Sequence, residues 1–312
     1  MTLVLDDQAS ELRAAVSRHA AGERASPARD EVVSTRHLFP RTFAAPRRRY
    51  KVVAIAGGKG GVGKTNLAVN LALCLGRLGT RTLLIDVDAG TANADLLLDV
   101  EPRHALTDFL SGRCDADALC RPIGPRVSFA AGVSGPDARS EQVLAVPRLF
   151  AASLDQLAAG ADLVLLDCGA GVGPTVRGPA LCADRVLVVA TPEPTAITDA
   201  YALMKVLHQR RSRFASSDRS SFAESFGIRP TVDIGLIVNQ VVRSRDAKLA
   251  ADRITAVAKR FLGVVVDVVG TVRFDRHVPA AVTRRTPVVT AYPRCRAARD
   301  ITALAQRLAV LV

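Results

Sequence analysis

The stretch Gly58-Lys59-Gly60-Gly61-Val62-Gly63-Lys64-Thr65 fits the pattern G-x-x-x-x-G-K-[ST], the phosphate-binding P-loop. Residues 51–56 before it form a short apolar run typical of a buried strand, and residues 66–78 after it carry apolar side chains at helical spacing. Strand, glycine-rich loop and helix is the arrangement that the motif requires, so this context argues against a chance glycine-rich turn.

Each part of this loop suits a nucleoside triphosphate. Glycines let the backbone wrap the β-phosphate and point N–H groups at it, and the helix that follows adds its positive N-terminal end. Lys64 offers a point charge to the β- and γ-phosphates, and the Thr65 hydroxyl can ligate Mg²⁺. We therefore expect the residues from Gly58 through Asn66 to bind ATP, with Lys64 taking part in catalysis.

The lysines of the chain are few, and their placement is informative. Lysine and arginine together number 42, but only six are lysines, and two of these, Lys59 and Lys64, fall in the loop. A compact ammonium group that fits beside phosphates explains this better than compositional drift does. Lys59 directly follows the first glycine, where a lysine can serve phosphates held by another subunit, so we count it among the candidate catalytic residues.

Short apolar runs alternate with helical patterns along the rest of the chain. This alternation predicts an α/β fold, with a mainly parallel twisted sheet covered by helices on both faces, as in P-loop NTPases. We expect a short helix over residues 1–19 and a flexible linker over 20–50, and hence an N-terminal region 1–50 followed by an ATPase domain 51–312. The apolar runs lie at 51–56, 82–86, 126–130, 162–167, 185–190, 233–239 and 264–270.

Composition narrows the class of protein further. The formal net charge of +12 could indicate affinity for nucleic acid or an anionic membrane, but the arginines are spread along the chain, which favours an ordinary solvated surface. No run of 18 apolar residues and no signal peptide is evident. The six cysteines are scattered and form no C-x-x-C pair, as expected for small core residues in a reducing cytosol. We expect a cytoplasmic protein.

Candidate metal-binding carboxylates follow two of the apolar runs. The run at 82–86 ends in Asp86, with Asp88 two residues further on, and the run at 162–167 ends in Asp167, the Walker B form. Such an aspartate holds Mg²⁺, often through its water shell, and Asp86 suits the same neighbourhood. Asp88 is better placed to orient or deprotonate the attacking water. A strand-end turn or helix cap is the ordinary use of such residues, but the adjacent P-loop outweighs it for Asp167 and Asp86 and, more narrowly, for Asp88.

Residues that recognise the base are harder to identify. Asn239 ends the run at 233–239, where its amide could pair with an adenine edge, although an asparagine that starts a loop would look the same. The segment from Val269 to Asp275 could form a wall over the base. We include Asn239 and Asp275 as candidate nucleotide-binding residues.

Three stretches resemble a known family. Lys59-Gly-Gly-Val-Gly-Lys64-Thr65 resembles the deviant Walker A motif of the MinD/ParA ATPases. The flagellar branch, FlhG/FleN, typically shows D-A-D-L-G-L-A-N-V-D and E-P-T-S-I-T-D-A-Y, and this chain has Asp86-Val-Asp88-Ala-Gly-Thr-Ala-Asn93-Ala-Asp95 and Glu193-Pro-Thr-Ala-Ile-Thr-Asp199-Ala-Tyr201. The N-terminal Asp7-Gln8-Ala9-Ser10-Glu11-Leu12-Arg13 is similar to the D-Q-A-x-x-L-R motif of that branch. The likeness covers residues 51–300 nearly without break.

This resemblance implies a nucleotide-driven switch. ATP would drive formation of a face-to-face homodimer in which Lys59 of each subunit reaches the phosphates of the other, Asp88 would orient the hydrolytic water, and hydrolysis would restore the monomer. It also implies control of flagellar number and placement, with the Asp7–Arg13 segment stimulating an FlhF-like partner GTPase. Flagellar basal-body components and, in some members, a transcriptional regulator are further partners.

The chain departs from the family pattern at two places. Arg273 stands where members often have proline, which puts the contact with the base in doubt. Many members carry an amphipathic membrane helix beyond the last core helix, whereas Ile301, Leu304, Leu308 and Leu311 form one stripe that we interpret as core packing. The alternative is a shortened helix that binds a membrane surface, so peripheral attachment to the inner face of the cell membrane stays open.

Other functions on the same fold were weighed. A ParA-like partition ATPase would bind DNA through basic residues, which the net charge permits and the Asp7–Arg13 segment disfavours. A MinD-like division-site regulator should bind anionic vesicles. An iron–sulfur carrier would need paired cysteines, and none is evident in the sequence.

Overall fold

The computed structural model describes residues 48–88, 93–132, 143–144, 147–215 and 233–310. The expected helix over 1–19 and most of the linker over 20–50 lie outside these residues, so the predicted division into two regions stays a prediction. Arg48 and Tyr50, at the start of the described chain, are bound to it: Arg48 donates to the carbonyl of Cys182 at 2.9 Å, and the Tyr50 hydroxyl contacts the Asp155 carboxylate.

Strands and helices alternate, as the sequence predicts. The strands are β1 (Lys51–Gly57), β2 (Thr82–Asp86), β3 (Arg121–Gly124), β4 (Val127–Ala130), β5 (Leu163–Ala170), β6 (Arg185–Ala190), β7 (Asp233–Val241) and β8 (Asp267–Arg273). The helices are α2 (Lys64–Arg77), α3 (Ala94–Leu98), α4 (Leu106–Leu110), α5 (Ala116–Leu119), α7 (Pro147–Leu157), α8 (Pro174–Cys182), α9 (Pro194–Ala215), α11 (Ser244–Leu262), α12 (His277–Thr283), α13 (Val288–Ala291) and α14 (Arg296–Ala309).

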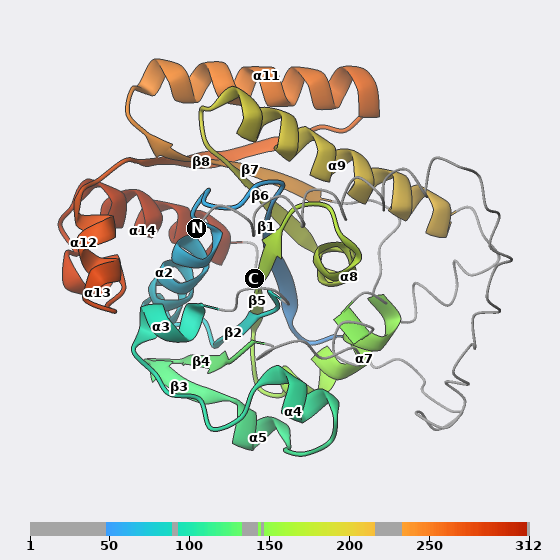
Figure 1. The fold of residues 1–312 in the computed structure, drawn as a ribbon, viewed down its shortest axis with the longest axis vertical. Coiled ribbons are helices and arrows are strands. Elements are labelled where there is room, and N and C mark those ends of the chain that lie inside the picture. The colour runs from blue at the N-terminus through green and yellow to red at the C-terminus, as the bar shows by residue number, and fades with distance from the viewer. Residues whose placement is uncertain (1–47, 89–92, 133–142, 145–146, 216–232, 311–312) are drawn as a thin grey trace, which may run out of the picture. The chain divides into compact units, whose positions relative to one another are not determined.

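In the described part of the chain the strands form one sheet in the order β3-β4-β2-β5-β1-β6-β7-β8. Every neighbouring pair is parallel except β3 with β4. The sheet separates two layers of helices, with α2, α12, α13 and α14 on one face and α7, α8 and α9 on the other (Figure 1). The predicted α/β fold with a mainly parallel, doubly covered sheet is therefore confirmed.

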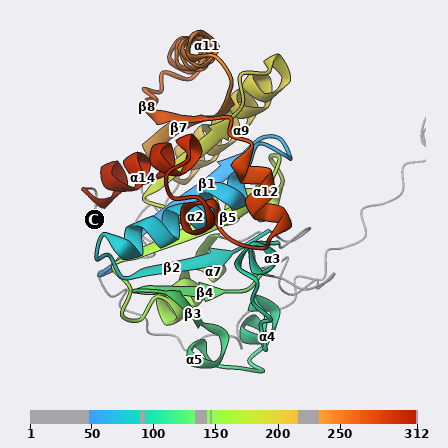
Figure 2. The same cartoon turned by 90° about the vertical axis from the view of Figure 1, so that its left-hand side faces the viewer.

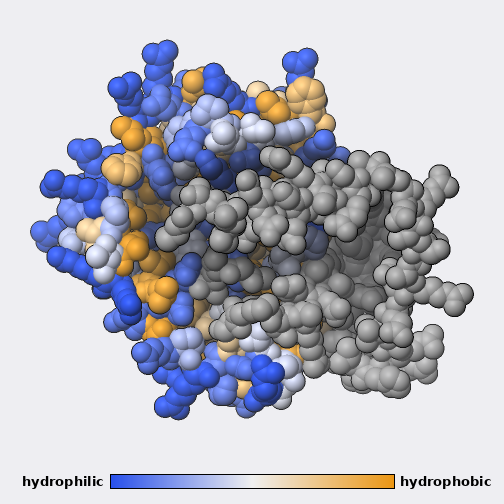
Figure 3. Space-filling model, viewed as in Figure 1, coloured by the Kyte–Doolittle hydropathy of each residue, from blue (hydrophilic) through white to orange (hydrophobic). Residues whose placement is uncertain are grey.

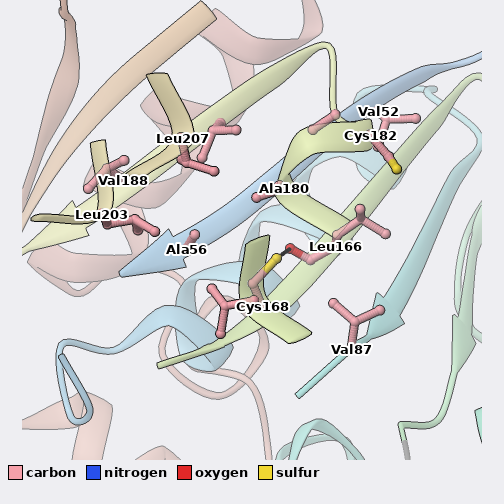
Figure 4. Packing of buried hydrophobic residues seen from close by; sticks show 14 of the residues in the cluster. Val52, Ala56, Val87, Leu166, Cys168, Ala180, Cys182, Val188, Leu203 and Leu207 are labelled. Carbon is pink, nitrogen blue, oxygen red and sulfur yellow. Dashed lines mark hydrogen bonds between the residues drawn. The ribbon is translucent and has the colours of Figure 1, made fainter. Parts of the chain in front are cut away.

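Alternating side chains of the central strand β1 serve both layers. Val52 and Ala54 belong to one buried cluster, together with residues of α7, α8, α9 and α11, whereas Val53 and Ile55 belong to the other, with residues of α2 and α14. A strand buried on both faces needs apolar residues at every position, which is why the run at 51–56 shows no polar alternation. Figure 4 shows the first cluster, in which Val52 and Ala56 face Ala180, Cys182, Leu203 and Leu207.

Two elements differ from the sequence-based expectation. Strand β3 was not expected, because Arg121-Pro-Ile-Gly124 is not an apolar run; it is a partly exposed edge strand that pairs antiparallel with β4. The last strand begins at Asp267 and not at 264, because Gly263, at φ 66°, ends α11 and the chain pairs with β7 only from Asp267 onward.

The surface over α11, at the top of the view, is mostly hydrophilic with a few hydrophobic residues among them (Figure 3). None of the described helices combines the length and the apolar character that a bilayer crossing requires.

Helix α14 lies beside α2 on one face of the sheet (Figure 2). Ile301, Leu304 and Leu308 are buried there, so the predicted core role of this stripe is confirmed for these three residues, while Leu311 lies outside the described residues. The Leu304 side chain packs so close to Gly270 of β8 that a Cβ at that position would lie 2.8 Å from it.

We predict that Leu308→Ala lowers the free energy of unfolding by about 2–5 kcal/mol, because it leaves a cavity in the core. Leu308 is 2% exposed, whereas Val310, two residues further on, is 85% exposed. Val310→Ala is the matched control and should change stability by less than about 0.5 kcal/mol. Urea denaturation measures both variants. Equal and small effects, combined with loss of vesicle binding in Leu308→Ala, would favour the membrane alternative.

Candidate functional site

The P-loop joins β1 to α2 at the carboxyl edge of the sheet. Gly61 and Gly63 have φ values of 78° and 89°, in the left-handed region that favours glycine. Gly58 is required for a different reason, since a Cβ there would lie 2.0 Å from the carbonyl oxygen of Asp199 in α9. The loop therefore needs glycine both for its own turns and for close packing against α9.

Two side-chain amides from the end of β7 hold the P-loop backbone. Asn239 Nδ2 donates to the carbonyl of Val62 at 2.8 Å, and Gln240 Nε2 donates to the carbonyl of Gly61 at 2.9 Å. Asn239 is thus a support of the loop, and its predicted contact with the base is not tested here. The sequence analysis did not identify Gln240. Its position directly after Asn239 was the one signal in the sequence, and its φ of 57° is known only from the structure.

Lys64, Thr65 and Asn66 form the first turn of α2. Lys64 is only 8% exposed, and its Nζ lies 3.4 Å from the carbonyl of Lys59. Burial lowers the pKa of Lys64, and the nearby carboxylates of Asp167 and Asp88 oppose that shift. The two carboxylates offset the cost of burying the Lys64 ammonium group only in part. The site is therefore suited to a ligand that brings more negative charge.

Asn66 takes part in a contact between α2 and α13 that the sequence does not indicate. Asn70, one turn further along α2, donates from Nδ2 to the backbone carbonyl of Asn66 at 2.7 Å and to its side-chain oxygen at 3.2 Å. The Asn70 side-chain oxygen accepts a hydrogen bond from the Val289 N–H of α13 at 3.0 Å. Asn70 is 1% exposed, so a buried amide connects the P-loop helix to α13.

Asp86 and Asp167 lie opposite each other in the register of β2 and β5, and each is 1% exposed. Neither carboxylate oxygen of Asp167 has a hydrogen-bond partner among the described residues. Burial, followed by the charge of Asp86, raises the pKa of Asp167 well above its ordinary value, opposed by the Thr65 hydroxyl, which lies close to the carboxylate but outside hydrogen-bond geometry, and by the charge of Lys64. A buried, unpartnered carboxylate beside a threonine hydroxyl fits a hard divalent cation such as Mg²⁺.

Asp86 is more fully engaged with the chain. Its Oδ1 accepts from the Asp88 N–H at 3.0 Å, and its Oδ2 accepts from the N–H groups of Asn93 and Ala94 at 3.2 and 3.3 Å. Burial nevertheless raises the pKa of Asp86 to about 7, with the charge of Asp88 adding to the rise and the backbone hydrogen bonds opposing it. Asp86 therefore ties the end of β2 to the start of α3, and its predicted place near the metal stays a prediction.

Asp88 lies against the chain that follows Asp167. A Cβ on Gly169 would come within 2.8 Å of Asp88 Oδ1, so only glycine lets the two segments approach this closely. The charge of Asp88 acts on the pKa of both Lys64 and Asp167, so its carboxylate lies near these two residues. The structure thus brings Lys64, Asp88 and Asp167 together, as the sequence predicts.

Lys59 points away from Lys64. Its Nζ contacts the Glu193 carboxylate at 3.0 Å and the Thr195 hydroxyl at 3.1 Å, at the start of α9. The Lys59 side chain is 41% exposed and that of Glu193 is 61% exposed, and an ion pair this open contributes no more than about 1 kcal/mol. Lys59 is accordingly available to other anions at this surface.

The segment after β8 is organised by carboxylates. Arg273 forms a bidentate ion pair with Asp300 of α14: its Nε and Nη2 donate to the two carboxylate oxygens at 2.8 and 2.7 Å. Asp275 accepts from the N–H and ring Nδ1 of His277 and from the N–H of Arg296. Burial would raise the pKa of Asp275, but these hydrogen bonds hold it below its ordinary value. Both oxygens of Asp275 are thus used within the chain, and its contact with the base stays a prediction.

Comparisons with known proteins agree with this geometry. Residues 53–288 match the model of the CobQ/CobB/MinD/ParA nucleotide binding domain. The chain is 35% identical to the antiactivator FleN of Pseudomonas aeruginosa over 266 residues, covering 83% of this chain and 86% of FleN. It is 30% identical to the flagellum site-determining protein YlxH of Helicobacter pylori over 226 residues, covering 70% of this chain and 68% of YlxH.

A solved structure has the same fold. The septum site-determining protein MinD of Pyrococcus horikoshii, in complex with Mg-ADP, superimposes with a TM-score of 0.66 at 23% identity, over 83% of this chain and 96% of MinD. The P-loop, the Walker B aspartate, the matched domain and the two relatives lead to one conclusion. The chain is an ATPase that belongs to the CobQ/CobB/MinD/ParA family of nucleotide-binding proteins.

Proposed function

We propose that this ATPase is a Mg²⁺-dependent switch that forms a homodimer with ATP and regulates the number or placement of flagella. One observation carries the ATP and Mg²⁺ part of the proposal: the unpartnered, buried Asp167 lies beside the partly compensated Lys64 at the mouth of a P-loop. Burial disfavours the charged form of both groups, so a bound anion would stabilise the Lys64 ammonium and a bound cation the Asp167 carboxylate, and Mg·ATP supplies the two together.

Different residues would bind the phosphates and the ion. The left-handed glycine turns and the first turn of α2 offer N–H groups that would surround the phosphates, and Lys64 would contact the β- and γ-phosphates. Thr65 and Asp167 would hold Mg²⁺, with Asp86 in the outer shell. The ion would neutralise negative charge that develops on the phosphates.

Hydrolysis needs a group that positions water. Asp88 packs against Gly169, is half-buried and lies near Lys64, so its carboxylate could accept a hydrogen bond from a water molecule aligned with the γ-phosphate. Holding water in this way, without forming bonds to ATP itself, would make Asp88 a residue for turnover and not for binding.

Dimerisation would use Lys59. Its contact with Glu193 is exposed and weak, so transfer of the ammonium group to phosphates in a partner subunit costs little and gains charge-assisted hydrogen bonds. Such a transfer would connect the ATP state of one subunit to the presence of the other.

The flagellar part of the proposal rests on similarity to relatives. FleN of Pseudomonas aeruginosa is named an antiactivator, and YlxH of Helicobacter pylori is named a flagellum site-determining protein. The N-terminal segment Asp7–Arg13, outside the described residues, is proposed to stimulate an FlhF-like GTPase. Basal-body components are proposed as further partners. Vesicle binding, measured on the wild type and on Leu308→Ala, tests whether the protein is recruited to a membrane surface.

We predict that the protein free of metal and nucleotide loses stability as the pH rises from about 4 to about 7. Unfolded carboxyl groups ionise near pH ~4, whereas the pKa of Asp86 is about 7 in the fold and that of Asp167 is also raised. The folded state therefore keeps protons that the unfolded state has released, and ionising these groups at higher pH penalises the fold.

Urea midpoints measured in EDTA across this pH range provide the test. Asp167→Asn should flatten the pH dependence. In a parallel series without EDTA, Mg·ADP should raise the urea midpoint of the wild type near neutral pH. Asp117→Asn, which changes an exposed carboxylate of α5, is the matched control and should keep the wild-type slope. An unchanged slope in Asp167→Asn would contradict the role of this carboxyl group.

We predict that Asp88→Ala keeps ATP binding but lowers hydrolysis by about 10²-fold or more, because the water is no longer positioned. The variant should accumulate as an ATP-bound dimer, seen by size-exclusion chromatography with light scattering, and revert to the monomer with ADP. Lys64→Ala should abolish ATP binding in calorimetry. Asp99→Ala, an exposed residue after α3, is the control for unchanged behaviour. Wild-type turnover in Asp88→Ala would refute the assignment of this residue.

We predict that deletion of residues 1–19 leaves ATP hydrolysis unchanged but abolishes stimulation of the partner GTPase. The reason is that none of the P-loop and carboxylate residues named for the site belongs to residues 1–19. GTP turnover by an FlhF-like partner, with and without added protein, gives the measurement. Full stimulation by the shortened protein would rule out this segment as the activator.

A further inference from the structure

A group of three potential metal ligands lies outside the P-loop site. Asp275 follows β8, His277 begins α12 and Cys295 precedes α14, and one ligand atom from each lies within 4.8 Å of the other two. Asp275 Oδ1 and His277 Nδ1 lie 2.7 Å apart. Residues from three elements therefore direct an oxygen, a nitrogen and a sulfur atom to one place.

The surrounding chain orients each of these atoms. Asp275 Oδ2 accepts from the N–H groups of Arg296 and Ala297 at 2.8 and 3.4 Å, and Oδ1 accepts from the His277 N–H at 3.0 Å while it faces the His277 ring. Cys295 Sγ accepts from the Ala298 N–H at 3.4 Å. The His277 ring lies 4.7 Å from that of Tyr292, centre to centre. Outer contacts of this kind are what fixes the ligands of a metal centre.

Capping of α14 does not by itself explain a cysteine at this position. Cys295 occupies the N-cap, where Ser, Thr, Asp and Asn are the residues that stabilise a helix best. Sulfur is a weak hydrogen-bond acceptor, so a cap alone would be better served by serine. What sulfur adds is affinity for a borderline or soft metal ion. Burial raises the pKa of Cys295, with the charge of Asp275 adding to the rise and the Ala298 N–H opposing it, so a bound ion would displace the thiol proton.

We propose that Asp275, His277 and Cys295 form a binding site for Zn²⁺, with water as the fourth ligand. The oxygen, nitrogen and sulfur donor set suits zinc and does not suit Mg²⁺, which prefers oxygen ligands alone. Ligands around tetrahedral zinc are about 3.3–3.7 Å apart, so the three side chains need to move by only ~1 Å to close on the ion. The Asp275 side chain is 8% exposed and that of His277 is 38% exposed, so an ion can enter from solvent.

Such an ion would clip together the two ends of the segment 275–295. That segment contains α12 and α13 and joins the edge strand β8 to α14. The site holds none of the P-loop or Walker B residues, but it shares Asp275 with the candidate contacts to the base, so zinc binding is measured in the absence of nucleotide. Its effect would be to hold this segment against the sheet.

The experiment is a titration of the full-length, metal-free protein with Co²⁺ and then Zn²⁺, without nucleotide. We expect one Co²⁺ per chain, with the near-ultraviolet absorption of a thiolate–cobalt bond, and its loss when Zn²⁺ displaces Co²⁺. Cys295→Ser should abolish the absorption and weaken Zn²⁺ binding at least about tenfold. His277→Ala should weaken it similarly.

Two further measurements separate metal binding from capping. Zn²⁺ should raise the melting temperature of the wild type and not that of Cys295→Ser, because only a folded site binds the ion. In metal-free buffer, Cys295→Ser should be as stable as the wild type or more stable, since serine is the better cap. Cys120→Ser, which changes a half-buried cysteine at the end of α5, is the matched control and should bind as the wild type does.

Three outcomes would overturn the proposal. One is the absence of thiolate–cobalt absorption in the wild type. Another is unchanged absorption and affinity in Cys295→Ser. The third is loss of binding in Cys120→Ser, which would place the metal at a different cysteine.

Discussion

The rest of the site depends on one constraint. Two carboxylates, Asp86 and Asp167, lie next to each other at the buried ends of β2 and β5. Burial opposes ionisation of both, and the charged form of Lys64, the buried cation that acts on Asp167, is itself disfavoured by burial. A fold that buries unlike charges without pairing them fully gives up stability in the empty state. That arrangement is useful only if a ligand completes it.

The loop that receives this ligand is held by parts of the chain far away in sequence. Asn239 and Gln240 fasten its carbonyl groups from β7, and the carbonyl of Asp199 in α9 fills the space that a side chain at Gly58 would need. In the same way, Asp88 occupies the space that a side chain at Gly169 would need. The position of each phosphate-binding N–H group is thus determined by the packing of the whole carboxyl edge and not by the loop alone.

The sequence was sufficient for the fold and for the residues with strong local patterns. Apolar runs predicted every strand buried on both faces, and the P-loop with Asp88 and Asp167 could be placed at one edge because parallel strands end together. The edge strand β3 could not be predicted, since Arg121-Pro-Ile-Gly124 lacks an apolar pattern. Nor could the contacts of Lys59 with Glu193 or of Asn239 with Val62, because polar pairs distant in sequence leave no periodic signal.

The buried Asn70 has a mechanical consequence. It joins the first turn of α2 to the backbone of α13, and breaking its contact would leave the Val289 N–H unpaired inside the protein, at a cost of about 1–3 kcal/mol. Helix α2 therefore cannot turn about its own axis independently. A change in its first turn would strain the Asn70 hydrogen bonds unless α13 moved with it, so the two helices are coupled through this one amide.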